Sequence, residues 1–375
     1  MIRLAGNFHC AQREHHPAAT EFTPARTMNI LFCSYVFPPS IGGIETVSQL
    51  LAEQFCRLGS TVTVITHTPG KEIDAEYKVV RRPSLKTLRK LACHSDIVFQ
   101  SNISLKTLLP LFFIRKPIVI AHHGRMTRVN GRRGWQDILK RSLLFRCSNI
   151  AISGMVAADL PIKSVVIADP FEPSEFTRSQ TGARDKDIVF LGRLVSDKGC
   201  DLALRALALL RQEGIMPSFT VIGDGPEMPA LKQLTAELGL TGQVDFAGTI
   251  REGRGKIVAR HKIMVVPSIW EEPFGVVALE GIAAGCAVVA SQSGGLSEAV
   301  GSCGILFPNR DVAALASALK RLLADSSLRD RLIAGRDRHL EHFQPHFVAK
   351  RYLEVFANAL RKWNRGSPAT HDSEA

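Results

Sequence analysis

Hydrophobic residues recur along this chain with two alternating periods. Short runs of apolar and β-branched residues, such as 61–66, predict strands, whereas apolar positions three and four residues apart, as in 45–58, predict helices. Strands and helices alternate, which favours βαβ units and therefore a parallel sheet. In the first half we expect strands at 28–35, 61–66, 96–100, 117–121 and 149–152, and helices at 45–58, 104–113 and 135–146.

The second half repeats this alternation. We expect its strands at 187–191, 218–222, 244–247, 263–266 and 287–290, and its helices at 200–212, 227–238, 276–284, 311–324 and 327–342. The whole pattern predicts an α/β protein with two Rossmann-like, doubly wound parallel sheets. Such sheets bind ligands at the carboxyl ends of their strands, so we expect the two halves to face a central cleft lined by those ends.

Length sets the expected number of domains. With 375 residues and a hydrophobic content of 45%, the chain is long and apolar enough for two cores. We place the domain boundary near 169–185, a stretch rich in Pro, Ser, Glu and Thr. Residues 1–27 are expected to be a disordered extension or to precede a translation start at Met28. The remaining expected parts are 28–168, 169–344, a last helix at 345–363 and a loose tail at 364–375.

Cysteines and apolar runs indicate the compartment. The eight cysteines are scattered without a C-x-x-C pair or a zinc-binding spacing, which favours a reduced, cytoplasmic protein. No apolar run reaches about eighteen residues, so a membrane-spanning helix is not expected. Asp185-Lys186-Asp187 is formally a D-x-D sequence, but it precedes a strand within the linker, and we assign it no metal.

Basic residues are concentrated in one segment. The formal charge is +12, and between Arg81 and Arg146 fifteen Lys and Arg are opposed by two Asp. Such a field favours an anionic partner: a membrane surface, a pyrophosphate-bearing acceptor or nucleic acid. Nucleic acid fits least, because no binding motif is present and aromatic residues make up only 7% of the chain. A solvated basic surface without a specific partner is the plain alternative.

The segment 266–301 holds the densest candidate chemistry. Glu272 follows an apolar strand, Phe274 and Gly275 open a helix, and Glu280 lies on that helix, eight residues after Glu272. A helix start offers unpaired N–H groups that bind phosphate or hydroxyl groups, here at Gly275, Val276 and Val277. A pair of carboxylates alone is more often solvated surface, and in an enzyme it would also suit hydrolytic acid–base work.

These motifs together resemble a known family. The E-x7-E segment EPFGVVALE is preceded in order by PPSIGGIE (38–45), AHHG (121–124), FLGRLVSDKG (190–199) and VIGDGPEMPALKQLTAELGL (221–240). This order and spacing resemble the retaining glycosyltransferases of family 4, the glycosyl transferases group 1, which have the GT-B fold. The likeness extends from Met28 to about Arg361. In that fold the last helix commonly crosses back onto the first domain.

The resemblance implies roles for the polar residues. Glu280 should bind the ribose hydroxyls and Glu272 should lie near the reacting carbon of the donor sugar. Arg193 and Lys198, which follow a strand of the second half, should neutralise the donor diphosphate. The family needs no metal and no cofactor besides the nucleotide diphosphate sugar.

The resemblance also extends to the first half. His123 corresponds to a histidine that faces the donor sugar, although the neighbouring His122 is an alternative. Glycines at the strand ends allow close approach of a ligand: Gly42, Gly43, Gly223, Gly294 and Gly295. The chain departs from the family at Ala168-Asp169-Pro170, where Asn-Gly is usual, and in the basic stretch 250–263 near the expected base, so the donor nucleotide stays open.

The resulting expectation is a retaining hexosyltransferase that uses a UDP- or GDP-sugar. Its acceptor would be a lipid-linked saccharide or glycolipid in cell-envelope polysaccharide assembly, such as lipopolysaccharide synthesis. The protein would then be a peripheral protein on the cytoplasmic face of a membrane. Two alternatives remain: a transferase of the same fold with a soluble acceptor, and a catalytically inactive scaffold that binds a nucleotide sugar.

Overall fold

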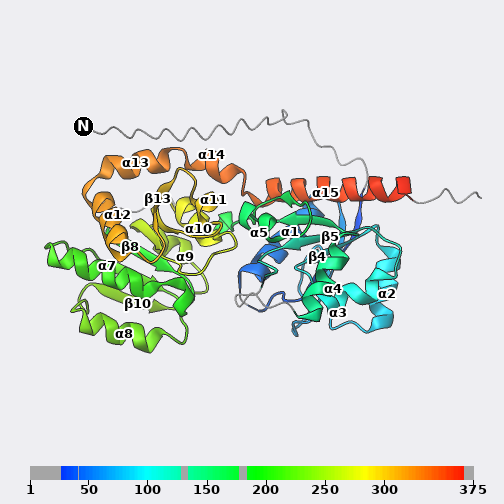
Figure 1. Ribbon diagram of the computed structural model, residues 1–375, viewed down its shortest axis with the longest axis horizontal. Helices are drawn as coiled ribbons and strands as arrows, with labels where there is room; N and C mark the ends of the chain where they lie inside the picture. Colours follow the sequence, from blue (N-terminus) through cyan, green and yellow to red (C-terminus); the bar gives the residue numbers. More distant parts are fainter. Residues whose placement is uncertain (1–26, 41, 128–133, 177–183, 367–375) are drawn as a thin grey trace, which may run out of the picture.

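The computed structural model describes residues 27–40, 42–127, 134–176 and 184–366. They form two parallel α/β sheets that lie in two lobes side by side (Figure 1). The first sheet has seven strands in the order β3-β2-β1-β4-β5-β6-β7. Their bounds are β1 (Asn29–Ser34), β2 (Thr61–Thr66), β3 (Lys78–Arg81), β4 (Ile97–Ser101), β5 (Ile118–His122), β6 (Ser148–Ala151) and β7 (Val165–Val166). The helices of this half are α1 (Gly43–Arg57), α2 (Leu85–His94), α3 (Leu105–Phe112), α4 (Trp135–Leu144) and α5 (Gly154–Asp159).

The second sheet has six strands in the order β10-β9-β8-β11-β12-β13. Its strands are β8 (Lys186–Leu191), β9 (Phe219–Ile222), β10 (Val244–Gly248), β11 (His261–Val266), β12 (Ala287–Gln292) and β13 (Gly304–Pro308). The helices are α6 (Pro173–Phe176), α7 (Cys200–Gln212), α8 (Met228–Glu237), α9 (Arg254–Val258), α10 (Val276–Ala283), α11 (Leu296–Val300), α12 (Val312–Ala324), α13 (Ser326–Ala334) and α14 (Arg336–Glu341). Both sheets have the expected doubly wound order, in which the strand numbers run outward in both directions from a central pair.

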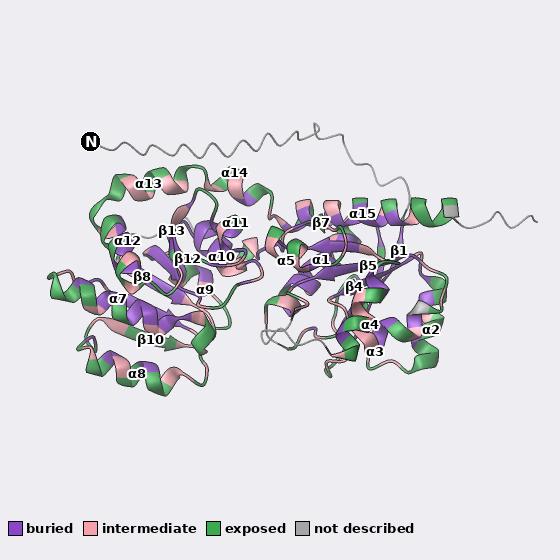
Figure 2. Ribbon diagram, viewed as in Figure 1, coloured by how far each residue is buried: buried purple, intermediate pink, exposed green. Residues whose placement is uncertain are grey.

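The central strands are buried on both faces, because helices cover each sheet from two sides (Figure 2). The last helix, α15 (Pro345–Gly366), packs on α1 and β5 of the first half and lies along the top of that lobe in Figure 1. Its Phe356 ring lies 5.4 Å from Phe55 and 5.1 Å from Phe99, measured between centroids. This aromatic cluster joins the end of the chain to the first sheet.

Several expected bounds agree with the structure and others do not. The strand 61–66 and the helix 200–212 have the predicted bounds. The single helix expected over 327–342 is wrong: a turn at Gly335 separates α13 from α14, since glycine disfavours a helix interior. The last helix continues to Gly366, beyond the predicted end at residue 363, so the tail begins later than expected. The extension expected at 1–27 lies outside the described residues except for Thr27.

Polar contacts join the two halves. Ser153 Oγ donates a hydrogen bond to the carbonyl of Pro273 over 2.6 Å, and Gly154 N–H donates to Glu298 Oε1 over 2.9 Å. Arg125 and Glu271 form an ion pair across the same junction. These contacts bring the segment after β5 and the start of α5 against the loop that holds Glu272. Across the described residues, no helix is long and apolar enough to span a membrane.

Candidate active site

Glu272 lies in the loop between β11 and α10 and is held by a lysine. Its Oε1 accepts hydrogen bonds from Lys198 Nζ at 2.5 Å and from Ser268 Oγ at 2.7 Å, and the residue is buried. Lys198 ends a short 3-10 turn that follows β8. Charge-assisted hydrogen bonds of this kind fix both partners. The lysine expected to meet the donor diphosphate therefore also orients the carboxylate expected to face the donor sugar.

The glycine-rich segment after β12 packs against the loop that holds Glu272. Gly295 N–H donates to the carbonyl of Glu272 over 2.7 Å. Gly294 has φ +57°, and a Cβ at this position would lie 2.2 Å from the same carbonyl oxygen. Because only glycine tolerates both the left-handed backbone and this approach, the two loops can pack together.

The start of α10 lies two residues after Glu272. Gly275 precedes the helix with φ +103°, so the N–H groups of Val276 and Val277 lie in its first turn without intrahelical partners. Phe274 is buried and packs on Phe343, with 5.5 Å between ring centroids, which anchors this start. The arrangement supplies hydrogen-bond donors and a favourable dipole for an anion.

Arg193 lies at the carboxyl end of β8, in the segment that also carries Lys198. Its side chain is exposed, and within the described part of the chain it forms no ion pair. A guanidinium that is not already engaged can bind a diphosphate with two hydrogen bonds.

Glu280 lies in the interior of α10, facing a mixed group of charges from α6 and α9. The pKa of Glu280 is raised to about 7, mainly by burial; Arg254 opposes the shift, and Glu175 and Glu172 contribute to it. Arg254 Nε in turn lies 3.7 Å from Glu175 Oε1. In the absence of a ligand, the Glu280 carboxylate is thus poorly compensated, and hydroxyl donors would stabilise its charged form.

His123 follows β5 and contacts residues of two other segments. Its Nδ1 lies 3.0 Å from Asp169 Oδ1, and its backbone N–H donates to Asn102 Oδ1 over 2.9 Å. Its Nε2 is buried and has no hydrogen-bond partner among the described residues. Because the Asp169 carboxylate can only accept, it fixes the proton on Nδ1 and leaves Nε2 for a ligand.

The neighbouring His122 has a structural environment instead. Its Nε2 pairs with Asn149 Oδ1 over 3.0 Å inside the first sheet. Burial lowers the pKa of His122 to about 4, although the bond to Asn149 acts in the opposite direction and His123 adds to the lowering. The geometry therefore favours His123 as the functional histidine.

The glycine loops occupy strand ends in both halves. Gly42 and Gly43 follow β1 and start α1, and a Cβ at Gly42 would lie 2.4 Å from Glu45 Oε2. Glu45 is buried and accepts from Ser40 Oγ over 3.0 Å. Gly223 follows β9 with φ +140°, and a Cβ there would overlap the carbonyl of Gly192. Backbone packing therefore requires glycine at Gly223, whereas Gly42 faces only the end of the Glu45 side chain and Gly43 has open space around it.

The D-x-D sequence is engaged in ion pairs. Asp185 pairs with Arg260, and Asp187 Oδ1 lies 2.7 Å from Lys262 Nζ. The described residues contain no group of three or more His, Cys, Asp or Glu that could hold a metal ion.

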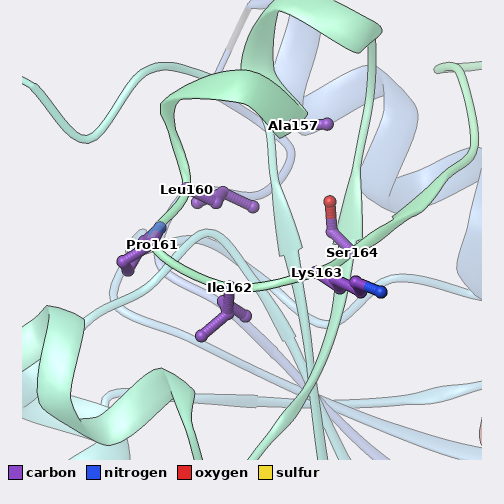
Figure 3. Close-up of a pocket in the computed structure, with 6 residues that line it drawn as sticks. All are labelled: Ala157, Leu160, Pro161, Ile162, Lys163 and Ser164. Carbon is purple, nitrogen blue, oxygen red and sulfur yellow. The ribbon is translucent and has the colours of Figure 1, made fainter.

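A separate hollow lies in the first half, between the end of α5 and β7 (Figure 3). Its volume is about 510 Å³, and it carries a lysine and a serine but no acidic or aromatic side chain. It is formed by Ala157, Leu160, Pro161, Ile162, Lys163 and Ser164. None of the candidate site residues borders it.

Several residues that contact the candidate site have no role predicted from the sequence. Asp169 was noticed only as a departure from Asn-Gly, while Asn102 and Ser268 lay in no motif. Their contacts join positions far apart in the chain, so no local spacing reveals them. The left-handed backbone of Asn102, with φ +62°, is the one local feature that marks it, and it too is visible only in the structure.

The fold and this arrangement of charges define the class of protein. Two doubly wound sheets, joined by a chain that returns to the first sheet through its last helix, form the GT-B fold. Residues 173–338 match the family described as glycosyl transferases group 1. The matched segment includes Arg193, Lys198, Glu272 and Glu280.

Known proteins resemble the chain over part or most of its length. The D-inositol 3-phosphate glycosyltransferase of Salinispora tropica is 35% identical over 184 residues, covering 46% of this chain and 38% of that protein. The lipopolysaccharide core biosynthesis glycosyltransferase LpsD of Rhizobium meliloti is 33% identical over 198 residues, covering 52% and 56%. The match therefore spans about half the length of these curated relatives. The structure of Anabaena HepE in complex with UDP and glucose superposes with a TM-score of 0.72 at 20% identity, covering 88% of this chain and 99% of that one.

Proposed function

We propose that this protein is a retaining, metal-independent hexosyltransferase that uses a UDP- or GDP-sugar as donor. The observation that carries the proposal is the arrangement of Lys198, Glu272 and the start of α10. Arg193 lies at the neighbouring strand end and forms no ion pair among the described residues. Cations and helix N–H groups suit a leaving diphosphate, and the adjacent carboxylate suits the positive charge that develops on the sugar. The match of residues 173–338 to the glycosyl transferases group 1 family and the UDP and glucose named for HepE support this choice.

These residues have different roles in the reaction. The acceptor hydroxyl oxygen bonds to the anomeric carbon on the face from which the diphosphate leaves, and its proton passes to the leaving phosphate oxygen. Arg193, Lys198 and the N–H groups of Val276 and Val277 stabilise the charge on that phosphate. Glu272 faces the anomeric carbon, and His123 directs Nε2 towards the donor sugar. Glu280 accepts hydrogen bonds from the ribose.

A panel of nucleotides tests the donor site. UDP, GDP, ADP, dTDP and CMP are each added to the purified protein, and the melting temperature is recorded. A ligand at one hundred times its Kd adds about 2.7 kcal/mol of stability. We expect UDP or GDP to stabilise the protein, Glu280→Ala to remove the effect, and Glu237→Ala, which alters an exposed carboxylate on α8, to preserve it. Stabilisation by no nucleotide would refute the donor assignment.

The acceptor we propose is a lipid-linked saccharide or glycolipid in envelope polysaccharide assembly, reached at the cytoplasmic face of a membrane. Helices α2, α3 and α4 lie together in the first lobe (Figure 1). Large apolar side chains are exposed at the end of α3 and the start of α4. Phe113 exposes 83% of its surface and Trp135 exposes 70%. A basic residue near an anionic leaflet is worth roughly 1 kcal/mol, and exposed aromatic rings insert at the interface. The name of LpsD is consistent with this acceptor class.

Vesicle binding separates this acceptor from the alternative of a soluble one, which the name of the Salinispora tropica protein favours. Sedimentation with phosphatidylcholine vesicles is compared with and without phosphatidylglycerol. We expect binding only to the anionic vesicles, weakened by Trp135→Ser and by salt. Met216→Ser, which alters an equally apolar and exposed position of the second half, is the control. Equal loss in both variants, or no binding, would favour the soluble acceptor.

A further inference from the structure

A cavity of about 490 Å³ opens in the first half, at the carboxyl ends of β1 and β4. Tyr35 follows β1, Asn102 follows β4, and the starts of α3 and α4 close the other sides. No residue assigned above to the donor lies in its wall. The polar and aromatic side chains of the wall are Tyr35, Ser101, Asn102, Ser104, Lys106, Gln136 and Lys140.

The cavity adjoins the candidate active site through two of its residues. Asn102 borders the cavity and at the same time accepts the backbone N–H of His123 at 2.9 Å. Ile44 borders the cavity and directly follows Gly42 and Gly43, the loop expected to approach the donor. A molecule bound in the cavity therefore lies on the first-sheet side of His123, where an acceptor hydroxyl has to enter.

The charged side chains of the cavity are all cationic. Lys106 and Lys140 come from two different helices, and neither forms an ion pair within the described residues. Tyr35 is 45% exposed, and Lys106 Nζ lies 5.8 Å from the centroid of its ring. This cation–π contact holds the ammonium group at the mouth of the cavity. No aspartate or glutamate lines the wall to offset the two charges.

The surroundings of Tyr35 extend the same surface. The His67 ring lies 4.9 Å from the Tyr35 ring, between centroids. The pKa of His67 is lowered first by burial and then by the positive charges of Lys106 and Arg82. The aromatic face offers the apolar contact area that a sugar ring needs, and the lysines offer point charges that bind phosphate.

We propose that this cavity is the acceptor subsite and that it selects a phosphorylated saccharide. The sugar ring lies against Tyr35, and the phosphate lies between Lys106 and Lys140. This inference rests on the proposed transferase function. The phosphate can belong to a soluble sugar phosphate or to a lipid-linked saccharide, since both present the same group. A neutral saccharide would leave the two lysines without a counterion.

Calorimetric titration of the full chain saturated with UDP tests the proposal. Glucose 6-phosphate and methyl glucoside are the soluble probes. We expect the phosphorylated probe to bind at least about tenfold more tightly, and Lys106→Gln or Lys140→Gln to weaken it by about tenfold each. Lys86→Gln removes an exposed charge on α2, outside the cavity, and serves as the matched control. UDP is titrated first into every variant, so a failed donor site is recognised separately from a failed acceptor site.

A second arm identifies the source of the phosphate. Vesicles carrying a lipid-linked sugar phosphate are compared with plain phosphatidylglycerol vesicles of equal charge. Tight binding of glucose 6-phosphate supports a soluble acceptor. Binding only to vesicles that carry the sugar phosphate supports a lipid-linked acceptor. In both cases Lys106→Gln and Lys140→Gln must weaken the binding. The proposal is overturned, while UDP binding still stands, if charged and neutral soluble probes bind equally and vesicles with the sugar phosphate bind no better than plain ones. Equal losses of glucose 6-phosphate affinity in Lys86→Gln overturn it too.

Discussion

Replacing Glu280 with glutamine should stabilise the protein without ligand at alkaline pH. Burial raises the pKa of Glu280 from 4.5 to about 7, so the folded protein holds a proton that the unfolded chain releases. A raised folded pKa gives stability that is fully present below about pH 4.5 and lost as pH rises to about 7. Above that pH the folded state holds a poorly compensated carboxylate, which glutamine does not have.

The expected size follows from the shift. At roughly 1.36 kcal/mol per pKa unit, the change corresponds to about 3 kcal/mol. Glu280 is only half-buried, and partial solvation reduces the expected gain to about 2 kcal/mol. At pH 5 the wild-type carboxyl is protonated in the folded state, so Glu280→Gln should then differ little from wild type.

Urea unfolding at pH 5, 6, 7 and 8 measures this difference. Glu252→Gln makes the same charge change on an exposed side chain and should give a difference near zero throughout. The reasoning would be refuted by an equal effect of Glu280→Gln at pH 5 and pH 8, or by the same pH slope in Glu252→Gln. UDP binding, measured in parallel, should weaken in Glu280→Gln although the folded state is more stable.

Four further substitutions have defined outcomes. Lys198→Gln removes the cation that holds Glu272, so kcat should fall by roughly 10²- to 10³-fold; an unchanged kcat would remove Lys198 from the site. Asp169→Leu removes the group that accepts from His123 Nδ1, so ¹⁵N spectra should show a smaller population of the Nδ1-protonated tautomer; an unchanged spectrum contradicts the pairing. Tyr352→Phe removes a hydroxyl that has no partner among the described residues, so the free energy of urea unfolding should change by less than about 1 kcal/mol. Phe356→Ala removes a buried ring and should lower the same free energy by about 3–5 kcal/mol.

Regular elements with strong periodicity were predictable from the sequence. The strand Thr61–Thr66 alternates β-branched residues, and the helix Cys200–Gln212 repeats leucine and alanine at helical spacing, so local preference and burial agree. The strand Lys78–Arg81 was missed because it lies at the sheet edge with no fully buried side chain. The break at Gly335 was missed because apolar residues continue on both sides of it.

The candidate site was predictable as far as motifs extend. Glu272, Gly275 and Glu280 lie within one short segment, so their spacing already places them at a helix start. The pairing of His123 with Asp169 joins positions 46 residues apart, and that of Lys198 with Glu272 joins positions 74 apart. Only the packing of strand ends brings such residues together, which no local pattern encodes.

Donor turnover by the wild-type protein and Glu272→Ala tests the central claim most directly. UDP- and GDP-hexoses are incubated with the protein and a sugar phosphate acceptor, and ³¹P NMR follows release of the nucleoside diphosphate. We expect release by the wild type, unaffected by EDTA, and a loss of roughly 10²-fold or more in Glu272→Ala. Glu237→Ala, which alters an exposed carboxylate on α8, should retain most of the rate. Equal rates in Glu272→Ala and the wild type would contradict the account.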